Sequence, residues 1–171
     1  MANVHPQENE LYNQIRTEQI KVDPLIWDMI YRYLGEYVSE IELTAFYFEK
    51  IQEPIAIEQA RKILEWTNKI REIVFKILHL ETVKDSMDLE KLKNIQPQLH
   101  KVINELFGHY VGNDVSTIHM IVADSLSPFG QEQPVPIEFT QKIINHTRSI
   151  HRFLDKLREA TTQTVSLKEG K

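Results

Sequence analysis

Apolar side chains recur at alternating intervals of three and four residues along three long stretches of this chain. Residues spaced in this way share one face of a helix, so each row predicts an amphipathic helix whose apolar face needs another helix to cover it. The stretch from Pro54 to about Val83 carries two adjacent rows, which predict a face wide enough to touch two neighbouring helices. The first row is Ile63, Trp66, Ile70, Ile73, Ile77 and Leu80, and the second is Ala56, Ala60, Ile63, Thr67, Ile70, Val74 and Ile77.

The other two long helices have recognisable start signals. Asp23-Pro24 combines an N-cap residue with a proline suited to the first helical position, and the predicted helix runs to about Gln52. The last helix is predicted from near Pro136 to about Ala160. The row of the helix opened by Pro24 is Trp27, Ile30, Leu34, Tyr37, Ile41, Thr44, Phe48 and Ile51, and that of the last helix is Ile143, Thr147, Ile150, Leu154 and Leu157.

Shorter helices are predicted between these elements and before them. A short one opens at His5-Pro6 and runs to about Ile20. Ser86 caps a further helix, which Pro97 kinks or divides. Gly112 is expected to stop that helix, and a shorter one follows from about Val115 to Leu126. Three prolines and a glycine within residues 127–136 predict a long loop.

Together the rows predict an all-α fold, an antiparallel helical bundle of about five or six helices in a single domain. Neither alternating strand patterns nor hairpin turns are evident, and we see no internal repeat or shift in composition. We expect an N-terminal arm with a short helix at residues 1–22, the bundle at 23–160 and a flexible C-terminal tail at 161–171, which has few apolar residues.

Composition narrows the range of partners. The chain has 171 residues, of which 42% are hydrophobic and 26% charged, as in ordinary globular proteins. Its net charge of −5 argues against a nucleic-acid partner, and its apolar runs are too short to predict a membrane-spanning helix. The absence of cysteine removes disulfides, thiolate metal sites and cysteine nucleophiles. The first ten residues lack the basic-then-apolar order of a secretory signal, so a cytoplasmic location is expected.

Catalytic signatures are missing from the sequence. It contains neither a Gly-x-Ser-x-Gly turn nor a glycine-rich phosphate loop, and every Glu lacks the His three residues later that dinuclear carboxylate sites in bundles use. We therefore expect a protein that is not an enzyme and needs no cofactor.

One group of side chains offers a possible ligand site. Glu105 and His109 lie four apart on one helical face, and His119 and Asp124 approach them if the chain turns at Gly112. These four residues are weak candidates for metal ligands. Gly108 leaves space between helices, so Glu105, Gly108, His109 and His119 form the predicted ligand-binding set. In the simpler interpretation, each histidine is an ordinary surface or boundary residue.

The first long helix carries aromatic residues outside its main row, which indicates burial on a second side. Tyr31, Tyr33, Phe46 and Tyr47 are the predicted interface residues, because aromatic side chains favour interfaces. We therefore expect a non-enzymatic regulatory or adaptor protein that contacts a partner protein or itself, as a homo-oligomer. The alternative is a sensor or carrier that binds a small apolar, tetrapyrrole or metal ligand between helices. A third hypothesis is a metal-dependent hydrolase that uses Glu105, His109, His119 and Asp124.

Overall fold

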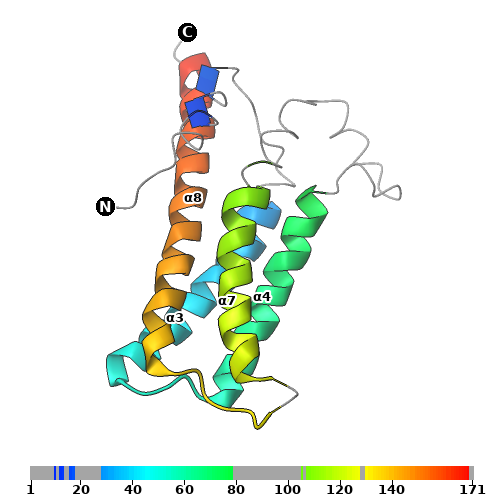
Figure 1. Cartoon of the computed structure of the whole chain (residues 1–171). Coiled ribbons are helices and arrows are strands. Elements are labelled where there is room, and N and C mark those ends of the chain that lie inside the picture. Colours follow the sequence, from blue (N-terminus) through cyan, green and yellow to red (C-terminus); the bar gives the residue numbers. More distant parts are fainter. Residues whose placement is uncertain are drawn as a thin grey trace.

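The computed structural model describes residues 28–78, 107–127 and 130–169, together with Glu10, Tyr12, Asn13, Arg16, Thr17 and Glu105; for 77–78 and 161–169 it describes the backbone alone. These residues are mostly helical and contain no strand, which confirms the all-α class (Figure 1). The elements are the π-helix η1 (Asp28–Leu34), α3 (Gly35–Ile51), α4 (Ile57–Leu78), the π-helix η2 (Phe107–Val111), α7 (Gly112–Ser125) and α8 (Ile137–Glu169).

The four α-helices enclose one hydrophobic core. Helix α3 packs against α4 and α8, and α7 packs against the same two helices. Residues 52–56, which connect α3 to α4, and the described residues between α7 and α8, 126–127 and 130–136, lie at the lower end of the molecule in Figure 1. There Ile55 and Val135 form an isolated antiparallel bridge, with both side chains fully buried.

The predicted apolar rows are confirmed on α8 and shifted on α3 and α4. Every residue of the α8 row is buried. On α3 the small residues Val38 and Ala45 lie at the centre of the buried face, while Tyr37 and Thr44 lie at its margin and Ile51 is 41% exposed. Helix α3 faces both α4 and α8, so its buried face is centred between them, and small side chains allow close approach there. On α4 the second row is buried from Ala60 to Val74, and Trp66 and Ile73 lie at its edge.

Two predicted helix ends are wrong. Gly112 does not stop a helix, because η2 passes directly into α7 and no glycine among the described residues has a positive φ. Helix α8 continues past Ala160 to Glu169, since adding a residue to an existing helix needs no apolar pattern. By contrast, α3 ends as predicted, with Gln52 in the left-handed conformation at φ 57°. The signals at His5-Pro6, Asp23-Pro24, Ser86 and Pro97 lie outside the described residues.

The helices form two units of the same plan, which overturns the expectation of no internal repeat. Each unit has a π-helix, an α-helix that begins with glycine, a connection with proline and a second α-helix. Segment 35–41 (GEYVSEI) matches 112–118 (GNDVSTI), and segment 54–70 (PIAIEQARKILEWTNKI) matches 134–150 (PVPIEFTQKIINHTRSI). Matching positions are buried alike: Leu34 and Val111, Val38 and Val115, Ile41 and Ile118, Ile63 and Ile143, Thr67 and Thr147, Ile70 and Ile150.

The spatial arrangement agrees with this sequence match. Helix α3 contacts its own partner α4 and the opposite helix α8, and α7 likewise contacts its own partner α8 and the opposite helix α4. The two units therefore make the same set of helix contacts. Ile55 and Val135 occupy matching positions and pair with each other, which is what an approximate two-fold axis through their bridge produces. The repeat is hard to see in the sequence because Ile41 precedes Pro54 by 13 residues, whereas Ile118 precedes Pro134 by 16.

Candidate protein-interaction surface

Exposed apolar side chains gather on the outward face of α3. Of the eight large hydrophobic side chains that are exposed among the described residues, four lie on α3 within residues 43–51. Leu43 is 63% exposed, Tyr47 58% and Phe46 45%. We call Leu43, Phe46, Tyr47 and Ile51 the α3 apolar patch. A stretch of helix that is apolar on two opposite faces is suited to packing on both of them.

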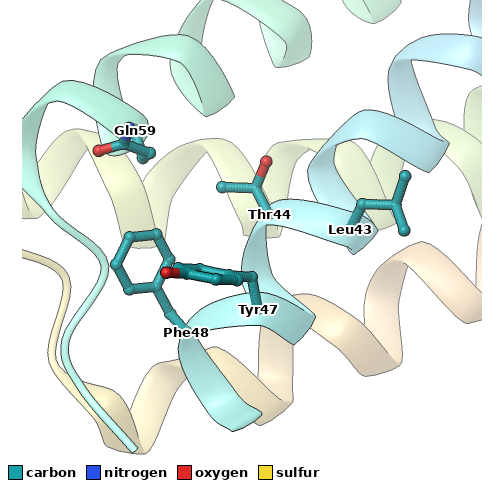
Figure 2. A pocket seen from close by; sticks show the side chains of 5 residues that line it. All are labelled: Leu43, Thr44, Tyr47, Phe48 and Gln59. Atoms are coloured by element: carbon teal, nitrogen blue, oxygen red, sulfur yellow. The ribbon is translucent and has the colours of Figure 1, made fainter. Parts of the chain in front are cut away.

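A shallow groove of about 280 Å³ adjoins the patch where α3 meets α4. Leu43 and Tyr47 form its outer wall, and Thr44, Phe48 and Gln59 complete it (Figure 2). The Tyr47 ring packs edge-on against Phe48, with 5.2 Å between ring centroids. Because Phe48 is itself buried, this contact ties the exposed ring to the core, and the groove offers an apolar floor for a partner's side chain.

Charged residues border the patch along the same helix face. Glu40 lies three residues before Leu43, and Lys50 lies three residues after Tyr47; both side chains are exposed. An apolar centre with charges at its ends is the usual anatomy of an interface, in which the centre is desolvated and the rim stays in water.

The second unit supplies an internal comparison for the patch. Leu43 matches Met120 of α7, which is also 63% exposed, but Phe46 matches Ala123 and Tyr47 matches Asp124. The fold therefore does not require aromatic side chains at these positions, because α7 packs in the same way without them. The aromatic part of the patch is a property of α3 alone.

Three of the four predicted interface residues are exposed. Phe46 and Tyr47 belong to the α3 apolar patch, and Tyr33 lies on η1, with the Arg32 guanidinium 5.8 Å from its ring centroid. Tyr31 instead faces α8: its hydroxyl donates a 2.6 Å hydrogen bond to the Leu154 carbonyl oxygen, and burial raises its pKa.

Leu43 and Ile51 are exposed apolar residues that are not among the predicted interface residues. Ile51 belongs to the row predicted to be buried, and Leu43 lies outside that row. The signal that finds Leu43 is its i, i+4 spacing from Tyr47, which places both residues on one face.

The predicted ligand site is not assembled around His109. Glu105, Gly108, His109 and Asp124 are all exposed, and the His109 ring packs edge-on against Tyr110. His119 faces α4, where its Nδ1 lies 3.1 Å from the Thr67 hydroxyl oxygen. Within the described ranges there is no group of three or more His, Asp or Glu side chains that could hold a metal ion. The helix continues through Gly112, so the turn that was expected to bring His119 and Asp124 beside Glu105 and His109 is absent.

One polar cluster at the α3–α8 contact has the residue types of a hydrolase triad. His151 Nε2 lies 3.4 Å from Ser39 Oγ and 3.7 Å from Glu42 Oε2, and Arg148 pairs with the same carboxylate at 3.4 Å. A triad needs the serine and the carboxylate on opposite ring nitrogens, so that one orients the ring while the other passes its proton. Here both lie at Nε2, so the cluster does not have the arrangement of a triad, and its contacts join α3 to α8.

A second polar pair joins α7 to α8. His146 Nδ1 lies 2.8 Å from Asp114 Oδ1, and both side chains are partly buried. Together with Thr67–His119 and Glu42–His151, this pair fixes how neighbouring helices are aligned. These polar contacts lie between helices, whereas the α3 apolar patch faces solvent.

Comparison with known proteins adds no family assignment. No protein-family model, curated protein or solved structure matches the chain. Among the helices in the described part of the chain, none is long and apolar enough to span a membrane.

Proposed function

We propose that this is a non-enzymatic regulatory or adaptor protein that acts through protein–protein contacts made by the α3 apolar patch. The observation that carries the proposal is the contrast between α3 and α7. Helices in matching positions bear Phe46 and Tyr47 on one and Ala123 and Asp124 on the other, although both pack on the same two neighbours. Large exposed aromatic side chains that the fold does not need are best explained by contact with another protein.

The proposal places the protein in the cytoplasm and takes its complete fold to be an antiparallel bundle of five or six helices, of which the described residues supply four α-helices. Neither nucleic acid nor a membrane is among its proposed partners. The ligand-carrier alternative gains no support from the structure, because Glu105 and His109 are exposed and a ligand bound to them would stay largely in water.

Site-specific photocrosslinking tests the proposal. A benzophenone amino acid replaces Tyr47 in one variant and Asp124, its counterpart on α7, in the other. In a lysate of the source cells, the variant labelled at position 47 should form discrete adducts with a protein, whereas the variant labelled at 124 should form few. Adducts of equal yield at both positions, or none at 47, would contradict a dedicated contact surface on α3.

A further inference from the structure

The exposed face of α3 is arranged symmetrically about the level of Ala45 along the helix axis, although Ala45 itself lies on the opposite, buried face. Glu40 and Leu43 precede Ala45 by five and two residues, and Tyr47 and Lys50 follow it by two and five. The outward face therefore reads acid, apolar, apolar, base in order along the helix, with all four side chains reaching solvent. Reversing the direction of such a helix exchanges the two charges and leaves the apolar centre in place.

We propose that the partner of the α3 apolar patch is a second copy of this chain, with the two α3 helices packed in opposite directions about a two-fold axis that passes between Leu43 and Tyr47, at the level of Ala45. The inference rests on the proposed function, because it names the occupant of the same surface. In this arrangement Leu43 packs beside Tyr47 of the partner subunit, and the pair is repeated on the other side of the axis. Two copies of one face forming a closed dimer is the commonest form of protein assembly.

The charges select this direction of packing. Antiparallel helices place Glu40 opposite Lys50 of the partner subunit at both ends of the contact, so the dimer gains two opposite-charge pairs. Parallel helices in register would place Glu40 against Glu40 and Lys50 against Lys50, and like charges facing each other disfavour a complex. The spacing of 40, 43, 47 and 50 by three, four and three residues is also the spacing by which helices interdigitate along a shared seam.

The α3–α4 groove agrees with this arrangement. Leu43 and Tyr47 form its outer wall, so the groove opens directly beside the proposed axis. Leu43 and Tyr47 of the partner subunit would cover both the patch and the groove mouth. In the second unit, the positions that match Glu40, Tyr47 and Lys50 are Thr117 and Asp124 on α7 and Ser127 just after it, which do not reproduce the sequence of charges or the apolar centre.

A charge-exchange experiment tests the pairing. Sedimentation equilibrium of the full chain should show a species of twice 20.2 kDa at micromolar concentration. Glu40→Lys alone and Lys50→Glu alone each create two like-charge contacts and should raise the dimer Kd by roughly tenfold. The double variant Glu40→Lys/Lys50→Glu restores both opposite-charge pairs and should return the Kd to near its starting value. The control Asp124→Lys carries the same charge change as Glu40→Lys, but on α7, and should leave the Kd unchanged.

Cysteine crosslinking tests the direction of the helices independently of affinity, because the natural chain has no cysteine. In the proposed register, two copies of residue 40 lie about 15 Å apart along the helix axis, whereas residue 40 faces residue 50. A short bismaleimide should therefore link Glu40→Cys to Lys50→Cys when the two variants are mixed, and neither variant to itself. Circular dichroism confirms that each variant remains helical.

The outcomes separate this inference from the proposed function. Monomers throughout, or a double variant as weak as the single ones, would overturn the α3–α3 dimer. If position 47 nevertheless crosslinks to a protein of a different mass, the contact surface stands and only its occupant is wrong. If position 47 crosslinks to nothing and the chain is monomeric, both are wrong. Efficient linking of Glu40→Cys to itself would show parallel helices and also overturn the inference.

Discussion

Ile55 and Val135 donate backbone hydrogen bonds to each other's carbonyl oxygens, at 3.0 Å and 2.9 Å, and their side chains are both fully buried. This reciprocal pair joins the two connections at one end of the helices, at matching positions of the two units. Replacing Ile55 by Ala should lower the free energy of unfolding by about 2–5 kcal/mol, because it leaves a cavity at the junction of the units. Urea denaturation measures the change. Ile51→Ala, at a 41% exposed position a few residues earlier, should change it by less than about 0.5 kcal/mol.

The two glycines that follow the π-helices should respond differently to a methyl group. A Cβ on Gly35 would lie 3.6 Å from the Ile30 carbonyl oxygen, an ordinary contact, whereas one on Gly112 would lie 3.3 Å from the Phe107 carbonyl oxygen. Gly35→Ala should therefore stabilise the protein by up to about 1 kcal/mol through helix propensity. Gly112→Ala should gain none of this, because a backbone carbonyl must shift to admit the methyl group. Thermal unfolding of the two variants checks the contrast, and equal gains would show that both π-helices relax freely.

Thr140 and Thr147 are both fully buried on α8, but only one of them has its hydroxyl satisfied. Thr147 donates a 2.8 Å hydrogen bond to the Ile144 carbonyl oxygen, while the Thr140 hydroxyl, at the position that matches Ala60 in the first unit, has no partner among the described residues. Thr140→Val should stabilise the protein by about 1 kcal/mol, because it removes an unsatisfied buried polar group. Thr147→Val should cost about 0.5–1.5 kcal/mol. Denaturant midpoints measure both, and a loss of stability in Thr140→Val would indicate a hydrogen bond to that hydroxyl.

His119 should make stability depend on pH. Burial, and secondarily the charge of Arg71, lower its pKa below the ordinary value of 6.5. At a pH between the lowered pKa of His119 in the folded state and its ordinary pKa in the unfolded state, the unfolded chain binds more protons than the folded one. The free energy of unfolding is therefore at its maximum above about pH 6.5 and falls as the pH decreases below that value. The wild type should therefore lose more stability than His119→Gln between about pH 7.5 and about pH 5.5. His109→Gln, at an exposed position, is the control and should behave like the wild type.

The helical class and the burial of α8 were predictable because apolar spacing reports the 3.6-residue period directly. The centre of the buried face on α3 was not, because Tyr37 and Val38 belong to adjacent rows that are equally regular. Only the positions of α4 and α8 decide which row is central. The predicted helix end at Gly112 is wrong because glycine, which ends many helices, also allows the Phe107 carbonyl oxygen of a π-helix to approach closely. The apolar row of a single helix does not show which other helices it will pack against. The centre of each buried face therefore becomes clear only when the helices are seen together.

The contact surface was predictable in part. Phe46 and Tyr47 stand out as aromatic residues outside the inward row, and both are exposed. Tyr31 is also aromatic and outside the predicted row, but it lies against α8, because it stands three residues before Leu34 in line with the row Leu34, Val38, Ile41 and Ala45 that is buried. The His109 set depended on a turn at Gly112, where the structure has a continuous helix instead.

The matched helix pairs have a consequence for the protein when it is cut. Each helix pair, α3 with α4 and α7 with α8, buries its apolar face against a pair of the same plan. A fragment that ends after α4 should therefore be able to pack against the same fragment of another molecule. Separate halves mixed in one tube should then recombine, and overproduction of one half should give domain-swapped assemblies in place of the intact fold.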